Sequence, residues 1–269
     1  MFFLVLPLFL ASYQRVYSQE DTEEIKITFD KVYSDYIGSA EEYNETHAEY
    51  VLKRAQYLKF LSLKSRQDAI DATLAMLENR DSVTIFYLKV LRFKLEEGIG
   101  IEDWVKDELY LRIDGEIEWF SLHKDNLITA SSLEDLVKDS NLALSRWSVV
   151  ERLAYEVMSV LSRGKIADFY KRSDDIYANV KEKLEMIKND DREGYSFSAE
   201  KFQVFDRWMF EAEGKIIRSK EKQDEADLLI ININKNKKGA PKNTYNSILS
   251  KLTESQLYLK DANSLLKEI

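Results

Sequence analysis

The sequence contains no cysteine, only two prolines and only eight glycines among its 269 residues. The absence of cysteine excludes disulfides, cysteine nucleophiles and thiolate metal sites. Tight turns need residues with a fixed or a positive φ. The small number of prolines and glycines therefore indicates few turns and long elements between them. Because 45% of the residues are hydrophobic and 32% are charged, the composition is that of a globular chain. We therefore expect an all-α fold.

The motifs of the common catalytic and metal sites are also missing. Neither His47 nor His123 has a glutamate three residues before it, so the Glu-x-x-His pattern of di-iron bundles is absent, as is the HExxH zinc motif. The two glycines of EEGIGIEDW, residues 96–104, follow an expected helix, so they indicate a helix end instead of a phosphate-binding loop. We expect no catalytic residue, no metal site and no cofactor, and we place both histidines on packing faces.

Positive charge is scarce relative to negative charge: 39 Lys and Arg stand against 48 Asp and Glu, a formal net charge of −9. A general binder of nucleic acid or of an anionic membrane is expected to carry the opposite sign. Long apolar runs are lacking after residue 18, since the longest, LLII at 228–231, is far too short for a bilayer core of about 30 Å. We expect neither a nucleic-acid partner nor a transmembrane span beyond residue 18.

The first 18 residues differ from the rest of the chain. Residues 2–11 form an apolar run with the length of the core of a secretory signal, and Val16 and Ser18 supply small residues before a cleavage point. We therefore expect a signal peptide at 1–18 and a secreted or extracytoplasmic protein of the cell envelope. An uncleaved N-terminal anchor is the alternative.

Apolar and aromatic residues recur every 3.5 residues, the spacing of a helix that buries one seam against a partner. The first series steps by four and three residues from Phe29 to Leu61 and keeps its phase across Gly38, which predicts one helix there. Similar series follow along the chain. The predicted helices cover roughly 24–62, 66–97, 102–128, 132–163, 165–191, 198–234 and 242–267.

Capping residues support these boundaries. Ser65 and Ser132 are each followed three residues later by an aspartate, Gly164 is placed to end a helix, and Pro241 suits a first helical turn. Because the connections are short, neighbouring helices should be antiparallel. We expect an elongated antiparallel bundle of about seven long helices with coiled-coil-like packing.

This bundle can be divided in two ways. It is either one all-helical domain over 19–269 or two sub-bundles, 24–163 and 165–269, that meet near Gly164.

Four tyrosines of the first series lie seven residues apart: Tyr36, Tyr43, Tyr50 and Tyr57. Tyrosine gives a packing seam a large area and sends its hydroxyl to the wet edge. The series spans about 32 Å at helical rise, which is long for a small-ligand site. Packing is the favoured interpretation, and an aromatic groove for a sugar or peptide is the alternative.

Two charged features remain. Asp81 falls on an apolar seam and needs a partner there, for which Arg54 on the first helix is a candidate. Four lysines gather in the expected turn at 232–243, where a solvated loop is the ordinary interpretation and a basic docking loop the sharper one. They are Lys235, Lys237, Lys238 and Lys242.

With no site motif, the sequence favours an exported, non-catalytic binding or structural protein that acts through its surface on a protein or cell-envelope polymer. The alternative is an extracytoplasmic ligand-binding or sensing module that uses the aromatic groove. A pore-forming protein and an enzyme without recognisable motifs are less favoured.

Overall fold

The computed structural model describes residues 19–130, 132–189, 197–235 and 240–269, and 93% of them are helical. These residues form no strand and six helices: α1 (Gln19–Phe60), α2 (Leu63–Glu96), α3 (Asp103–Leu127), α4 (Leu133–Lys188), α5 (Ala199–Lys235) and α6 (Pro241–Glu268). The all-α prediction is confirmed, with six helices where the sequence predicted about seven. The expected signal peptide lies outside the described residues.

Gly164 accounts for the difference in helix number. It was expected to end a helix, but α4 continues through it for 56 residues, and Gly164 is buried. A Cβ atom at this position would overlap the carbonyl oxygen of Ile99, in the turn between α2 and α3. Gly100, in the same turn, has a φ of 65° and also lies against Gly164. The glycine therefore permits close backbone packing and does not break the helix.

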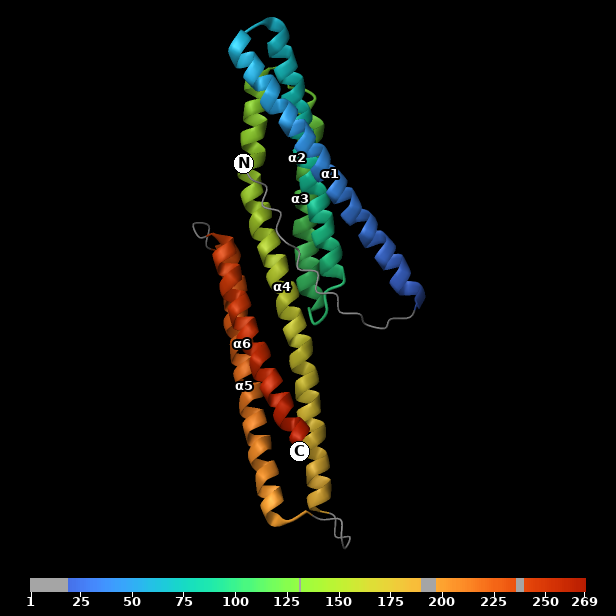
Figure 1. Cartoon of the computed structure of the whole chain (residues 1–269), viewed down its shortest axis with the longest axis vertical. Coiled ribbons are helices and arrows are strands. Elements are labelled where there is room, and N and C mark those ends of the chain that lie inside the picture. The colour runs from blue at the N-terminus through green and yellow to red at the C-terminus, as the bar shows by residue number, and fades with distance from the viewer. Residues whose placement is uncertain (1–18, 131, 190–196, 236–239) are drawn as a thin grey trace.

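The molecule is elongated, and α4 runs along much of its length (Figure 1). Helices α2 and α3 pack on the N-terminal half of α4 and α1 packs on α2, while α5 and α6 lie along the C-terminal half of α4. At 1.5 Å per residue, the 56 residues of α4 span about 84 Å. One helix thus connects two groups of packed helices.

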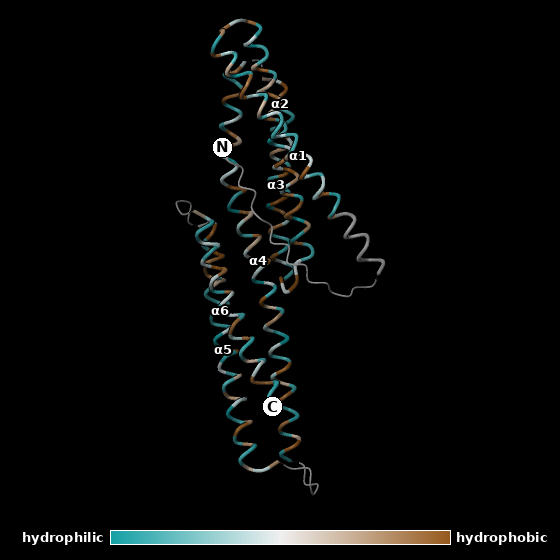
Figure 2. The backbone as a smooth tube through the Cα atoms, viewed as in Figure 1, coloured by the Kyte–Doolittle hydropathy of each residue, from teal (hydrophilic) through white to brown (hydrophobic). Residues whose placement is uncertain are grey.

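Each group has its own apolar core. The core around α2, α3 and the first half of α4 includes Leu88, Leu91, Ile113, Phe120 and Val150, and the core of α4, α5 and α6 includes Leu184, Met209, Ile216, Leu252 and Leu259. Hydrophobic residues alternate with hydrophilic ones along every helix (Figure 2). This pattern is the structural counterpart of the 3.5-residue repeat.

Apart from Gly164, the helix ends agree with the capping analysis in all but one case. The Ser132 hydroxyl accepts a hydrogen bond from the Asp135 amide at 3.1 Å, Pro241 begins α6, and α1 is continuous through Gly38, as predicted. The N-cap of α2 is Ser62, not Ser65. Both are part of a reciprocal capping box, and the helix starts three residues earlier than the sequence suggested.

Candidate functional site

A cluster of buried polar side chains lies where α2, α3 and α4 meet. Asp81 of α2 occupies the seam position that the sequence indicated and is 0% exposed. The predicted partner, Arg54, is exposed on α1, so that pairing is wrong. The partners of Asp81 are its neighbour Arg80 and His123 of α3, both buried. Periodicity placed Asp81 on the seam but gave no information on which helix faces it.

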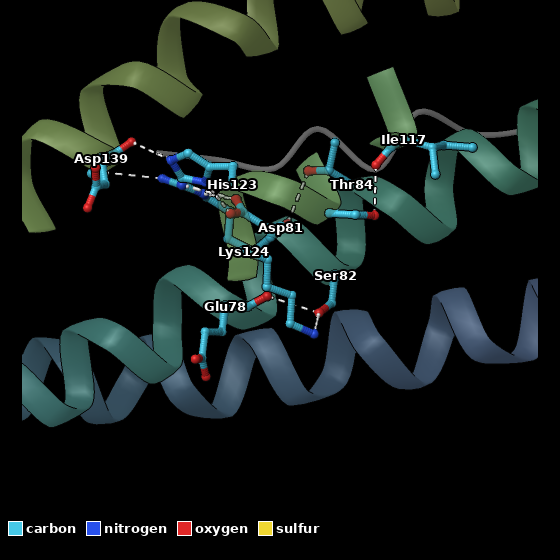
Figure 3. Close-up of polar contacts among 11 residues, drawn as sticks. Glu78, Asp81, Ser82, Thr84, Ile117, His123, Lys124 and Asp139 are labelled. Atoms are coloured by element: carbon cyan, nitrogen blue, oxygen red, sulfur yellow. Dashed lines mark hydrogen bonds and ion pairs between the residues drawn. The ribbon is translucent and has the colours of Figure 1, made fainter. Parts of the chain in front are cut away.

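The hydrogen bonds of this Asp81 cluster cross three helices (Figure 3). Nδ1 of His123 lies 2.5 Å from Oδ2 of Asp81, and the Arg80 guanidinium donates to Oδ1 at 3.1 and 3.2 Å. The other ring nitrogen of His123, Nε2, lies 3.2 Å from the backbone carbonyl oxygen of Asp139 on α4. Arg80 also donates to the Ser140 hydroxyl at 3.3 Å. Every polar edge of the Asp81 carboxylate and of the imidazole is therefore engaged.

The partners determine where the protons lie. A carbonyl oxygen only accepts hydrogen bonds. Nε2 of His123 therefore carries a proton and donates a hydrogen bond to the backbone carbonyl oxygen of Asp139. The short contact between Nδ1 and Asp81 then holds one further proton, carried either by the imidazole or by the carboxyl group. In both arrangements His123 has no unused lone pair. It cannot serve as a general base without breaking the cluster.

Aromatic and charged neighbours extend the cluster along α3. The indole of Trp119 stacks on the His123 ring, with centroids 5.0 Å apart and planes 13° apart. The Arg146 guanidinium from α4 lies 5.4 Å from the centre of the Trp119 ring and donates two hydrogen bonds of 2.7 Å to the buried Glu116. This bidentate pair is a strong and directional contact. It joins α3 to α4 about two turns from the Asp81 cluster.

An Asp–His pair is two thirds of a hydrolytic triad, so the missing third is decisive. In a triad, Nε2 faces the hydroxyl of the nucleophile. Here Nε2 of His123 faces the Asp139 carbonyl oxygen instead. The arrangement fixes the relative positions of three helices, because a buried charge without its partners destabilises the fold.

Serines with a lysine three residues later also fail to form a reactive pair. This spacing occurs at Ser121, Ser162, Ser198, Ser219 and Ser264. The hydroxyls of Ser121, Ser162 and Ser264 donate to backbone carbonyls of their own helices. The Ser198 hydroxyl accepts from the backbone amide of Lys201, and Ser219 shares a buried 2.7 Å hydrogen bond with Ser255. Lys222, which follows Ser219, pairs with Glu225. In each case the hydroxyl has a hydrogen-bond partner other than the side chain of the lysine that follows it.

The tyrosines of the α1 series face α2. The ring of Tyr36 lies 5.9 Å from that of Tyr87, Tyr43 is 8% exposed in an apolar cluster, Tyr50 packs against the same cluster, and Tyr57 is half-buried. Burial raises the pKa of the Tyr36 and Tyr43 hydroxyls. These contacts favour packing. The aromatic groove stays a prediction that ligand binding must test.

The other predicted site residues are dispersed. Lys237 and Lys238 lie outside the described residues, Lys235 ends α5, and Lys242 is exposed in the first turn of α6. His47 is half-buried between Tyr43 and Tyr50, whose rings lie 5.7 and 6.0 Å away. The basic docking loop therefore stays a prediction.

Metal sites and membrane-spanning helices are both absent from the described residues. They contain no group of three or more His, Asp or Glu side chains that could hold a metal ion. Among the same residues, no helix has both the length and the apolar character that crossing a membrane requires.

The chain was compared with protein-family models, curated proteins and solved structures. No family model matches it, and neither does any curated protein or any solved structure.

Proposed function

We propose that this chain is an exported, non-catalytic binding or structural protein of the cell envelope that acts through contacts on its surface. One observation carries the proposal: the outer face of α3 bears Trp104, Leu111 and Leu122, which are 68%, 76% and 56% exposed. Spacings of seven and eleven residues put all three on one side of a helix. A row of large exposed apolar side chains is typical of an interaction surface.

A similar row on α5 supports this proposal. Phe210, Ile217 and Leu228 follow the same spacing and are 76%, 54% and 65% exposed. The buried polar groups of the Asp81 cluster, in contrast, are used within the core, where Asp81 and His123 satisfy each other. The surface is therefore the part of the molecule with unused binding capacity. Export rests on the apolar segment at 2–11.

The α3 row can be tested by cross-linking in the envelope fraction of cells that produce the chain. Leu111→Ser combined with Leu122→Ser should remove a specific cross-linked partner while leaving the thermal midpoint unchanged, because both side chains are exposed. The matched control is Met186→Ser with Leu257→Ser, at positions 67% and 54% exposed and away from both rows. A partner that survives the α3 change and is lost in the control would contradict the assignment.

The export part needs its own measurement. The mature protein should be recovered outside the cytoplasm and should begin at Gln19. Recovery of the chain only from the cytoplasm would show that the location is wrong, whatever the α3 row binds.

A further inference from the structure

The turn between α1 and α2 combines basic and exposed apolar residues at one end of the molecule (Figure 1). We call residues 50–67 the hairpin tip. This segment contains no acidic residue, although the net charge of the chain is −9. It contains five basic residues: Lys53, Arg54, Lys59, Lys64 and Arg66. Positive charge is thus concentrated at the hairpin tip of an acidic molecule.

Large apolar side chains project from the same turn. Leu58, Phe60, Leu61 and Leu63 are 57%, 63%, 71% and 85% exposed. Leu61 has a φ of 50°, a backbone conformation that non-glycine residues rarely adopt. The turn therefore keeps a leucine where glycine or asparagine would be less strained and where its side chain gains no burial. Strain of this kind is a reason to look for a function.

The cations of the hairpin tip are weakly neutralised by the rest of the protein. Lys53 and Lys64 lie 3.9 and 3.7 Å from Asp68, and Arg66 lies 3.7 Å from Glu134 on α4. Exposed pairs at such distances contribute little. The Lys59 ammonium lies 5.2 Å from the centre of the exposed Phe60 ring. These charges remain available to an external anion.

We infer that the hairpin tip docks on an anionic lipid surface, an inference that rests on the proposed function because it names one partner of the exposed surface. The apolar residues Leu58, Phe60, Leu61 and Leu63 enter the boundary between headgroups and acyl chains. The surrounding lysines and arginines contact the anionic headgroups. Interfacial segments bury their apolar side chains to a depth of about 5–10 Å, which one to two helical turns can fill.

The chemistry favours lipid over other anionic partners. Nucleic acid would use the cations but leave Phe60 and Leu63 in water. A bilayer interface uses both properties at once, since apolar burial and attraction to anionic lipid both add to binding. Side chains that project from a turn at the end of a long molecule can also reach a flat surface without a clash. The association is peripheral and involves no helix that crosses the membrane.

The negative charge of the whole chain does not prevent this contact. Charges are screened over about 8–10 Å at physiological salt, whereas α2 alone is about 51 Å long at 1.5 Å per residue. Most acidic residues therefore lie several screening lengths from a surface that touches the hairpin tip. The expectation from net charge, that an anionic membrane is not a partner, applies to the molecule as a uniform charge and not to its end.

The test is co-flotation of the full chain with vesicles of phosphatidylcholine, alone or with about 30 mol % phosphatidylglycerol, an anionic lipid. We expect binding to the anionic vesicles to be at least tenfold stronger, and to weaken as salt is raised, because each basic residue near the surface contributes about fivefold. All variants retain residues 1–18, so any contribution from that apolar segment is the same in each.

Two variants separate the apolar from the electrostatic contribution. Leu58→Ser, Phe60→Ser and Leu63→Ser together should reduce binding at least tenfold. Arg54→Gln, Lys59→Gln and Lys64→Gln together should remove the preference for anionic vesicles.

Each variant has a matched control. For the apolar set it is Ile176→Ser, Met186→Ser and Leu257→Ser, and for the basic set it is Lys165→Gln, Lys171→Gln and Lys183→Gln, all at exposed positions far from the hairpin tip. Both controls should bind like the unchanged chain. Circular dichroism checks that every variant is folded. If the apolar variant does not fold, the basic variant alone tests the inference.

Four results would overturn the inference: equal binding to neutral and anionic vesicles, no effect of either variant, equal effects in the controls, or self-association of the chain that the apolar variant abolishes. Tighter binding to a short DNA duplex than to anionic vesicles would also count against it. None of these results affects the α3 row, whose cross-linked partner is measured separately. Failure of the hairpin tip and failure of the proposed function are therefore distinguishable.

Discussion

At the scale of single residues, the buried polar positions carry the most specific information. Asp81 could be located from the sequence, because it interrupts an apolar series on a helix. Its partner His123 could not, because the series gives the phase of each helix but not its neighbours. Arg80 adjoins Asp81 in the chain, and the sequence offered no reason to prefer it over Arg54. Contacts between helices thus decide which charges pair.

Removing Asp81 should show how strongly the cluster holds the helices together. Asp81→Ala leaves Arg80 and His123 buried without their acceptor, and we expect a loss of about 3–5 kcal/mol in the free energy of unfolding. The control is Asp114→Ala, which breaks the half-exposed pair with Arg92 and should cost less than about 1 kcal/mol. Urea titration of both variants measures the difference. Equal losses would mean that the Asp81 cluster has no special structural role.

The tyrosine series offers a second test at this scale. Tyr43 is the buried member, and Tyr43→Ala should cost about 3–5 kcal/mol of unfolding free energy, as large-to-small aromatic changes in a core do. Tyr57→Ala, at a half-buried position near the hairpin tip, should cost clearly less. A nearly neutral Tyr43→Ala that abolished binding of a sugar or peptide would establish the aromatic groove in place of packing.

At the scale of helices, the prediction that failed was a helix end at a glycine. A glycine after a regular helical series usually marks a C-terminus, and Gly164 has that position in the sequence. In the structure the helix continues, and the missing side chain lets the turn at Gly100 approach α4. The need for a glycine at position 164 comes from its contact with the turn at Gly100, which lies about 60 positions earlier in the chain.

Glycine substitutions should therefore have opposite signs at two helical positions. A Cβ at Gly164 would lie 2.6 Å from Cγ1 of Ile101, so Gly164→Ala should destabilise the fold by about 1–3 kcal/mol through overpacking. At Gly214 in α5 nothing lies within 4 Å of an added Cβ, so Gly214→Ala should stabilise by about 0.5–1 kcal/mol through helix propensity. Thermal unfolding of the two variants gives both signs. Stabilisation by Gly164→Ala would contradict the close packing.

At the scale of the whole molecule, the sequence determined the fold class but not the arrangement. A repeat of 3.5 residues and the shortage of turn-forming residues were sufficient for an all-α prediction. They could not show that α4 passes through both groups of helices, because two helices with a glycine between them and one long helix have the same pattern. The division into sub-bundles at 24–163 and 165–269 stays a prediction about folding units.

The length of α4 leads to the last prediction, which concerns shape in solution. A compact domain of 269 residues would have a radius of gyration of about 18 Å, whereas α4 alone is about 84 Å long. Small-angle X-ray scattering should therefore give a radius of gyration well above the compact value and a maximum dimension of at least the length of α4. Gly164→Ala, if it remains folded, should keep this maximum dimension, because the substitution disturbs the turn against α4 and not the helix itself. A radius near 18 Å would mean that α4 is bent back on itself in solution. The hairpin tip would then no longer stand at the end of an extended molecule, and its reach to a lipid surface would be lost with it.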